Sequence, residues 1–196
     1  MTRVPLISRD ELDAEVEAAM ELQVEQLGYV PNSLLTMAHR PKTASAFAKL
    51  AGEVMIGGTL DRPLKQLVAY VASNAAGCRY CQAHTGKRST EFGVEQEKIQ
   101  HAFEFETSDL FTDAERAALR VARDAAFVPS DVRDEHFERL REHFDDGEIV
   151  EIVSVISLFG WLNRWNDTMA TTLETAPAEF AAANLERSGW EIGAHA

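Results

Sequence analysis

The chain has 196 residues, of which 45% are hydrophobic, so it is long enough to bury one substantial core. Its formal net charge of −13 at pH 7 repels phosphate backbones and anionic lipid, so we expect neither nucleic acid nor a membrane among its partners. No stretch reaches the ~18 apolar residues of a membrane span, and the acidic N-terminal segment lacks the pattern of a signal peptide. These features predict a cytoplasmic protein.

Helical periodicity runs through almost the whole chain, and no stretch alternates as a β-strand does. Glycines, prolines and capping residues divide this pattern into segments; for example, Thr112 and Glu115 have the spacing of a capping box. The predicted helices cover residues 9–27, 34–39, 43–56, 61–77, 78–93, 94–105, 112–127, 131–144 and 148–173. No low-complexity linker separates them, so the sequence predicts a single all-α domain over residues 1–196.

Two further features concern the organisation of this domain. Residues 174–196 have mixed character and are predicted to form a C-terminal arm or a subunit contact. Aligning Gln66 with Glu151 superimposes the apolar positions of two predicted helices. This similarity fits an internal repeat of helical hairpins packed around one site, and it also fits two buried helices that share apolar spacing by chance.

The stretch GCRYCQAHTG, residues 77–86, holds both cysteines of the chain. If the stretch is helical, Cys78 and Cys81 lie one turn apart on one face, and His84 lies one turn further on. The positive end of a helix dipole, Arg79 and a protonated His84 would all favour the thiolate form. Three interpretations stay open at this point: a redox dithiol, a metal site, and two buried core neighbours.

The metal interpretation requires more ligands than this stretch supplies. The pattern C-x-x-C-x-x-H offers three at most, whereas structural zinc usually draws on two separated pairs of ligands. The other histidines show no ligand pairing. We therefore expect no metal and no cofactor.

Several segments resemble the alkylhydroperoxidase D-like, carboxymuconolactone decarboxylase-like superfamily, and in particular its peroxidase-related branch. The resemblance is carried by LGYVPNSLLTMAHRPKTASAF, LKQLVAYVASNAAGCRYCQAHTGKRSTEFG, LFTDAERAALRVARDAAF and DGEIVEIVSVISLFGWLNRWNDTM, and it covers residues 27–172. It implies a multihelical alkylhydroperoxidase D-like fold, assembly into homo-oligomers, and a dithiol that reduces peroxides or exchanges disulfides.

The resemblance also implies roles for individual residues. Cys81 would attack the peroxide and Cys78 would resolve the product. In the redox members the histidine of the proton relay lies four residues after the second cysteine, but here that position is Thr85. His84 lies one residue earlier, and helical spacing still places it beside Cys81, so we expect it to be the proton carrier. In the redox members a glutamate precedes the first cysteine by twelve residues, but here that position is Gln66, which cannot accept a proton. Gln66 can approach the thiols only if the chain folds back at Gly77 into a hairpin.

The sequence therefore predicts a thiol-dependent peroxidase or disulfide oxidoreductase, with a small hydroperoxide as substrate and a thiol reductant that the sequence does not identify. Because of Gln66 we expect a slow enzyme, unless another acid such as Glu151 completes the proton relay. Two alternatives are a cofactor-free decarboxylase that makes no use of a thiol pair, and a non-catalytic helical oligomer that senses redox state.

Overall fold

The computed structural model describes residues 2–196, with the backbone alone at positions 22, 23, 26 and 27. The described residues form helices and no strands, which confirms the predicted all-α class. The α-helices are α1 (Ala14–Leu27), α2 (Asn32–Met37), α3 (Pro41–Ile56), α4 (Arg62–Ala76), α5 (Arg79–Glu91), α6 (Gln96–Gln100), α7 (Asp113–Ala125), α8 (Asp134–Arg141), α9 (Asp146–Met169) and α10 (Thr175–Asn184). Short 3₁₀ helices cover Arg9–Glu11, Ala102–Glu104, Glu186–Ser188 and Gly193–His195.

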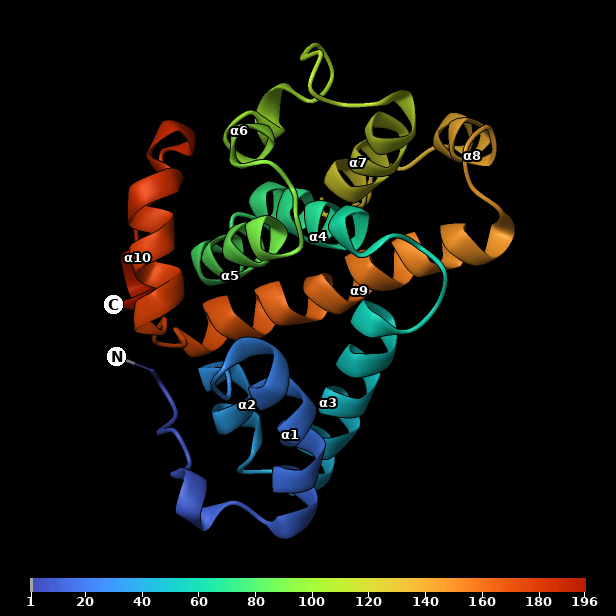
Figure 1. Ribbon diagram of the computed structural model, residues 1–196. Coiled ribbons are helices and arrows are strands. Elements are labelled where there is room, and N and C mark those ends of the chain that lie inside the picture. Colours follow the sequence, from blue (N-terminus) through green and yellow to red (C-terminus); the bar gives the residue numbers. More distant parts are fainter. Residues whose placement is uncertain (1) are drawn as a thin grey trace.

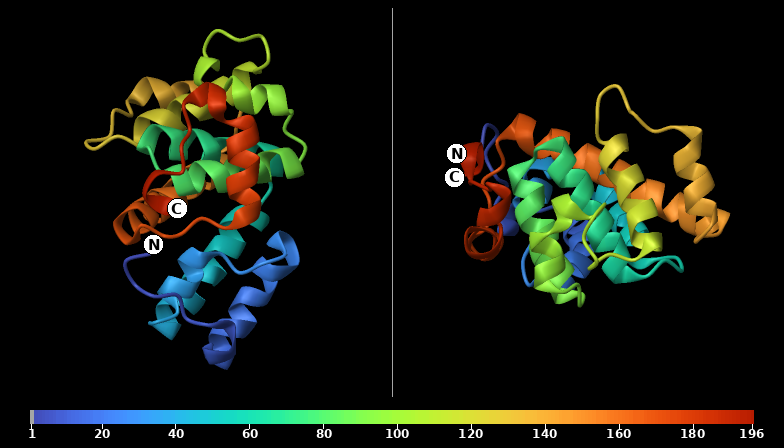
Figure 2. Two further views of the ribbon diagram at one scale, coloured as in Figure 1. Left: turned by 90° about the vertical axis from the view of Figure 1, so that its left-hand side faces the viewer. Right: turned by 90° about the horizontal axis from the view of Figure 1, so that it is seen from above.

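Helix α9 crosses the middle of the molecule and organises the other helices (Figure 1). Helices α4 to α8 lie on one side of α9, and α1 to α3 lie on the other. Helix α10 stands at one end, where it packs against α5. Both chain termini lie beside α10, as the two further views show (Figure 2). No helix in the described part of the chain is long and apolar enough to span a membrane.

The helix boundaries follow the local signals of the sequence. The predicted capping box at the start of α7 is present, because Thr112 Oγ1 accepts a hydrogen bond from the Glu115 N–H at 3.2 Å. The first predicted helix begins later than expected. Residues 9–11 form a separate 3₁₀ turn, and the Asp13 side chain caps the new start by accepting from the Glu15 N–H at 2.9 Å.

A sharp turn at Gly77 joins α4 to α5. Gly77 has a φ of 80°, in the left-handed region that side chains disfavour, and this conformation ends α4. The next residue, Cys78, is already the N-cap of α5, so the two helices form a hairpin and pack along one another. The chain therefore folds back at Gly77, as it must if Gln66 is to approach the thiols.

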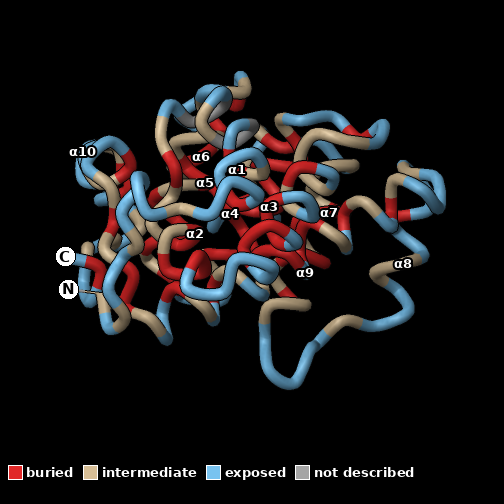
Figure 3. The backbone as a smooth tube through the Cα atoms, turned by 90° about the horizontal axis from the view of Figure 1, so that it is seen from below, coloured by how far each residue is buried: buried red, intermediate tan, exposed pale blue. Residues whose placement is uncertain are grey.

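The hydrophobic core lies where α4, α5, α7 and α9 meet (Figure 3). Its largest fully buried side chains include Tyr70, Leu67, Leu119 and Ile152. Burying one aliphatic side chain of this size contributes roughly 1.5–3 kcal/mol, so this centre supplies most of the driving force for folding. The cysteines lie at the start of α5 and are held by this rigid centre, as a site with fixed geometry requires.

Candidate active site

Both cysteines are free thiols inside the protein. Cys78 is the N-cap residue of α5 and is 0% exposed, and Cys81, in the first turn, is 2% exposed. The hydrogen bond of the Cys78 thiol to the Cys81 sulfur, together with burial, raises the pKa of Cys78 well above its ordinary range. The expected lowering of the thiol pKa is therefore wrong for Cys78, which stays protonated while Cys81 accepts its hydrogen bond.

Cys81 receives a second polar contact, from the opposite side of the hairpin. Asn166, a fully buried residue of α9, donates its Nδ2 to Cys81 Sγ at 3.4 Å. A donor at this position stabilises negative charge on the sulfur. Cys81 is thus the cysteine that Asn166 contacts.

His84 is paired with a carboxylate that the sequence did not point to. Its Nε2 lies 2.6 Å from Oε2 of Glu174, and the Tyr29 hydroxyl lies 3.4 Å from its Nδ1. The ring of Tyr80 stacks on the imidazole with the ring centroids 4.5 Å apart. With Nε2 committed to the carboxylate, Nδ1 is the atom of His84 that can accept a proton.

Three donors hold the Glu174 carboxylate in place. Besides His84, the Tyr80 hydroxyl donates to Oε1 at 2.8 Å, and the backbone N–H of Asn32 donates to the same oxygen at 2.6 Å. Burial on its own would raise the pKa of Glu174, but the charge and hydrogen bond of His84 and the Asn32 N–H lower it. Glu174 is therefore an ionised, oriented partner for His84, as the carboxylate is in a catalytic triad.

The C-terminal segment closes over the site within the same chain. Glu174 is the N-cap residue of α10, and α10 packs on α5. Gly86 makes this approach possible, because a β-carbon there would lie 3.3 Å from both Phe180 and Tyr70. The predicted C-terminal arm thus supplies a site residue to its own protomer.

A small cavity opens in front of the Cys81 sulfur. Its volume is about 130 Å³, and Cys81, His84 and Gln66 contribute to its wall. The rest of the wall is mainly apolar and includes Leu34, Phe47, Met55, Ile56, Leu158, Phe159 and Leu162. Cys81 therefore faces the cavity, and Cys78 lies behind it.

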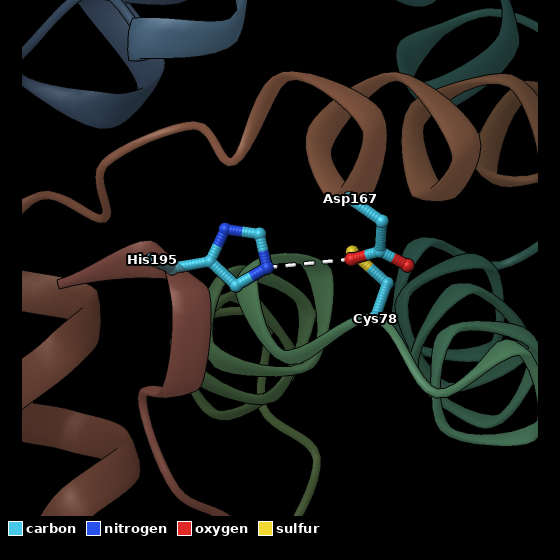
Figure 4. A group of neighbouring side chains, drawn as sticks. All are labelled: Cys78, Asp167 and His195. Atoms are coloured by element: carbon cyan, nitrogen blue, oxygen red, sulfur yellow. Dashed lines mark hydrogen bonds and ion pairs between the residues drawn. The ribbon is translucent and has the colours of Figure 1, made fainter. Parts of the chain in front are cut away.

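Behind the cavity, Cys78 has a histidine and a carboxylate of its own (Figure 4). The Nε2 of His195 lies 3.3 Å from Oδ1 of Asp167, and its Nδ1 lies 2.8 Å from the Thr171 carbonyl. A hydrogen bond also links this imidazole to Cys78. Sequence spacing carries no signal that would bring residue 195 to the cysteines.

The ligand atoms of Cys78, Asp167 and His195 lie within 4.8 Å of one another, a spacing at which side chains can share a metal ion. The His195 nitrogens, however, are both used as hydrogen-bond donors. Burial alone would lower the pKa of His195, but the bonds to Asp167 and Cys78 outweigh it and raise the pKa to about 9. A protonated imidazole does not bind metal, so we interpret the group as a hydrogen-bonded triad.

The two predicted relay positions lie in different surroundings. Gln66 is buried in the cavity wall with Cys81 and His84, so its predicted place beside the thiols is geometrically possible. Glu151 is held elsewhere, by Lys65 Nζ at 2.7 Å and by the backbone N–H groups of Thr59 and Leu60. These partners outweigh burial and lower the pKa of Glu151 to about 2, as expected for a structural ion pair. The carboxylate beside His84 is Glu174.

Comparison with known proteins agrees with this geometry. The sequence profile of the carboxymuconolactone decarboxylase family matches residues 41–124, which include the hairpin of α4 and α5 with both cysteines and His84. Over these residues the chain is similar to the carboxymuconolactone decarboxylase family. An uncharacterized protein of Bacillus subtilis strain 168, YdfG, is 28% identical over 110 residues, which cover 55% of this chain and 72% of YdfG.

Two solved structures are similar to almost the whole chain. The debrominase Bmp8, as a cysteine-to-alanine variant in complex with 2,3,4-tribromopyrrole, has 33% sequence identity and a TM-score of 0.86 over 93% of this chain and 97% of Bmp8. A peroxidase-related protein from Ralstonia eutropha JMP134 with an alkylhydroperoxidase AhpD core has 26% identity and a TM-score of 0.79 over 91% of this chain and 94% of its own. These relatives confirm the predicted alkylhydroperoxidase D-like fold.

Proposed function

We propose that this chain is a thiol-dependent oxidoreductase that reduces small organic hydroperoxides with the Cys78–Cys81 dithiol. The observation that carries the proposal is the cavity of about 130 Å³, whose wall includes both Cys81 and His84, the histidine that Glu174 holds. A buried nucleophile beside a histidine that a carboxylate orients is the arrangement that activates a thiol.

The oxidative half of the reaction begins at Cys81. His84 takes the thiol proton at Nδ1, with the Glu174 carboxylate stabilising the imidazolium that forms. The Cys81 thiolate attacks the terminal peroxide oxygen, the O–O bond breaks, and His84 returns the proton to the departing alkoxide. The products are an alcohol and a sulfenic acid on Cys81.

Cys78 then completes the oxidation. Its sulfur attacks the Cys81 sulfenic acid, forming the disulfide, and the Cys78 proton leaves with the hydroxide as water. An external dithiol returns both cysteines to thiols and is itself oxidised to a disulfide, so two electrons enter for every peroxide reduced.

The cavity indicates the size and polarity of the substrate. An apolar cavity of ~150 Å³ holds one benzene ring, and the volume here is about 130 Å³. Aliphatic side chains, Phe47 and Phe159 line most of the wall, so an alkyl or aryl group gains more from binding there than hydrogen peroxide does. The proposal therefore favours a hydroperoxide with one small apolar group.

Reductive dehalogenation is the second candidate, because of the similarity to Bmp8 over almost the whole chain. The same dithiol can supply it. The Cys81 thiolate takes bromine from an aryl bromide, the ring carbon takes a proton, and the Cys78 sulfur then displaces bromide to leave a disulfide. In the net reaction, an aryl bromide and two thiols are converted to the arene, a disulfide and hydrogen bromide.

Steady-state turnover tests the two candidates together. The reduced protein is supplied with a dithiol reductant and with cumene hydroperoxide, hydrogen peroxide or 2,3,4-tribromopyrrole in parallel. We expect turnover of cumene hydroperoxide in preference to hydrogen peroxide, and its loss in Cys81→Ser. Bromide release without peroxide consumption would favour dehalogenation, and no turnover of any of the three would contradict the proposed function.

We also infer that the protein forms homo-oligomers. An apolar groove of about 910 Å³ runs between α3 and α9, and Leu50, Val150 and Trp161 on its walls are 54%, 64% and 48% exposed. Apolar surfaces of this kind usually mark contact sites, and the family resemblance implies a second copy as the occupant. Light scattering of the wild type and of a Trp161→Glu variant tests this, since the variant should show a smaller mass.

A further inference from the structure

His195 and Asp167 have no part in the peroxide chemistry described above. They come from the last 3₁₀ helix and from α9, and they meet at Cys78. His195 is buried, with its side chain 4% exposed, whereas the Asp167 side chain is 46% exposed. A buried imidazole within 4.8 Å of a cysteine sulfur requires an explanation.

The hydrogen bonds fix the protonation of His195. Nδ1 donates to the Thr171 carbonyl, which can only accept, so Nε2 must carry a second proton to satisfy the Asp167 carboxylate at 3.3 Å. The groups that face this imidazole are Asp167, the Cys78 thiol, the Thr171 carbonyl and the Tyr80 ring, whose centroid is 5.8 Å away. With a pKa of about 9, His195 is a cation at neutral pH.

We propose that His195, oriented by Asp167, is a second catalytic histidine that serves Cys78 by stabilising the thiolate released when the disulfide opens. The proposal rests on the Cys78–Cys81 disulfide of the proposed function. It gives each cysteine its own histidine and carboxylate, and it assigns the direction of the reduction: the reductant attacks Cys81, and Cys78 is the leaving sulfur.

The reduction balances as two thiol–disulfide exchanges. A reductant thiolate attacks Cys81, which faces the cavity, and forms a mixed disulfide; the Cys78–Cys81 bond breaks, and its electron pair goes to Cys78. The imidazolium of His195 stabilises the Cys78 thiolate and can give it a proton. The second thiol of the reductant then displaces Cys81, so that the reductant leaves as a disulfide.

The raised pKa of Cys78 in the reduced protein is compatible with this role. Its largest cause is the hydrogen bond that the Cys78 thiol makes to the Cys81 sulfur. In the mixed disulfide, Cys81 is bonded to the reductant and carries no negative charge. The largest cause of the raised pKa of Cys78 is then absent, and the imidazolium of His195 remains beside the Cys78 thiolate.

The rate of disulfide reduction tests the proposal. The protein is oxidised with diamide, so that the test does not depend on peroxide chemistry, and the intramolecular disulfide is verified by mass. Its reduction by dithiothreitol is then followed by quenched alkylation. A leaving thiol that is harder to ionise by about two pKa units leaves about tenfold more slowly, so His195→Gln should slow reduction about tenfold at pH 7.

Two further variants support the comparison. Asp167→Asn should also slow the reduction of the disulfide. Because Asp167 is partly exposed, this variant tests the proposal even if His195→Gln does not fold. The control is His136→Gln, because His136 also pairs with an aspartate, Asp124 at 3.1 Å, and should leave the rate unchanged. The ratio of wild-type to His195→Gln rates should fall towards one as the pH rises through about 9, where His195 loses its proton.

A monothiol identifies the sulfur that is attacked. After a short reaction of the oxidised wild type with 2-mercaptoethanol and an acid quench, peptide mapping should find the adduct on Cys81. Any one of four results would overturn the proposal. The reduction rates could be equal for the wild type and both variants, or the adduct could be found on Cys78. The rate difference could vanish when a chelator is added, or diamide could fail to form the disulfide. Peroxide turnover that fails while the reduction data hold would count against the proposed function alone.

Discussion

The Nε2 atom of His84 lies 2.6 Å from Oε2 of Glu174, although 90 positions separate the two residues in the chain. Helix α5 supplies the histidine and the N-cap of α10 supplies the carboxylate. The family resemblance implies a glutamate twelve residues before the first cysteine, where this chain has Gln66. Glu174 provides a carboxylate to His84 from the opposite direction, so the expectation of a slow enzyme no longer follows.

Replacing Glu174 with glutamine should lower the peroxidase rate by about 10²-fold at neutral pH, because the histidine loses the charge that stabilises its protonated form. Glutamine keeps the shape and one hydrogen-bond acceptor, so the fold should be retained. The matched control is Glu179→Gln, an exposed glutamate on the same helix. Single-turnover peroxide consumption provides the measurement, and equal rates for the two variants would exclude Glu174 from the relay.

Gln66→Glu should change the peroxidase rate by different amounts in two backgrounds. In the wild type we expect little gain, because Glu174 already occupies the carboxylate position beside His84. In the Glu174→Gln background, a carboxylate at position 66 in the same cavity wall should raise the peroxidase rate several-fold. The rates of the four proteins form a double-mutant cycle, and a Gln66→Glu effect that is the same in both backgrounds would contradict this account.

The sequence was informative about the fold and only partly about the site. Local spacing predicted the helix end at Gly77 and the cap at Thr112, because both depend on neighbouring residues. Glu174 reaches His84, and His195 reaches Cys78, only through the packing of the C-terminal segment, and no spacing rule reports such contacts. The mixed composition of residues 174–196 gave no chemical signal beyond a possible arm.

Asn166→Asp should make Cys81 less reactive. The substitution keeps the size of the side chain but replaces a donor at 3.4 Å from the Cys81 sulfur with a negative charge, which opposes the thiolate. We expect the rate of alkylation by iodoacetamide at pH 7 to fall about tenfold, measured in a Cys78→Ser background so that one thiol reports. Asn166→Ala, which removes the donor without adding charge, should show a smaller decrease; the reverse order would argue against an electrostatic role.

Glu151→Gln should reduce stability without changing chemistry. The substitution leaves Lys65, whose side chain is 1% exposed, without its carboxylate, and we expect a loss on the order of 3 kcal/mol in the free energy of unfolding at pH 7. Because folding lowers the pKa of Glu151 from 4.5 to about 2, its contribution is full above pH 4.5 and is lost as the pH falls through about 2. The difference from wild type should shrink over that range.

Urea denaturation at several pH values measures this difference. Glu142→Gln, which breaks the exposed pair with Arg139, is the control and should cost less than about 1 kcal/mol. Peroxidase activity per folded molecule should be unchanged in Glu151→Gln. A lower activity with unchanged stability would instead indicate that Glu151 acts in the proton relay, as the sequence suggested.

The central claim is that Cys78 and Cys81 act as one redox pair with Cys81 as the attacking thiol, and a stoichiometric oxidation tests it most directly. The reduced protein is treated with one equivalent of cumene hydroperoxide, quenched with iodoacetamide and weighed by intact mass spectrometry. The account predicts that the wild type loses two hydrogens and resists alkylation, that Cys78→Ser carries a sulfenic acid on Cys81, and that Cys81→Ser stays unoxidised. Two thiols that both remain open to alkylation in the wild type, or a sulfenic acid that forms only on Cys78, would contradict it.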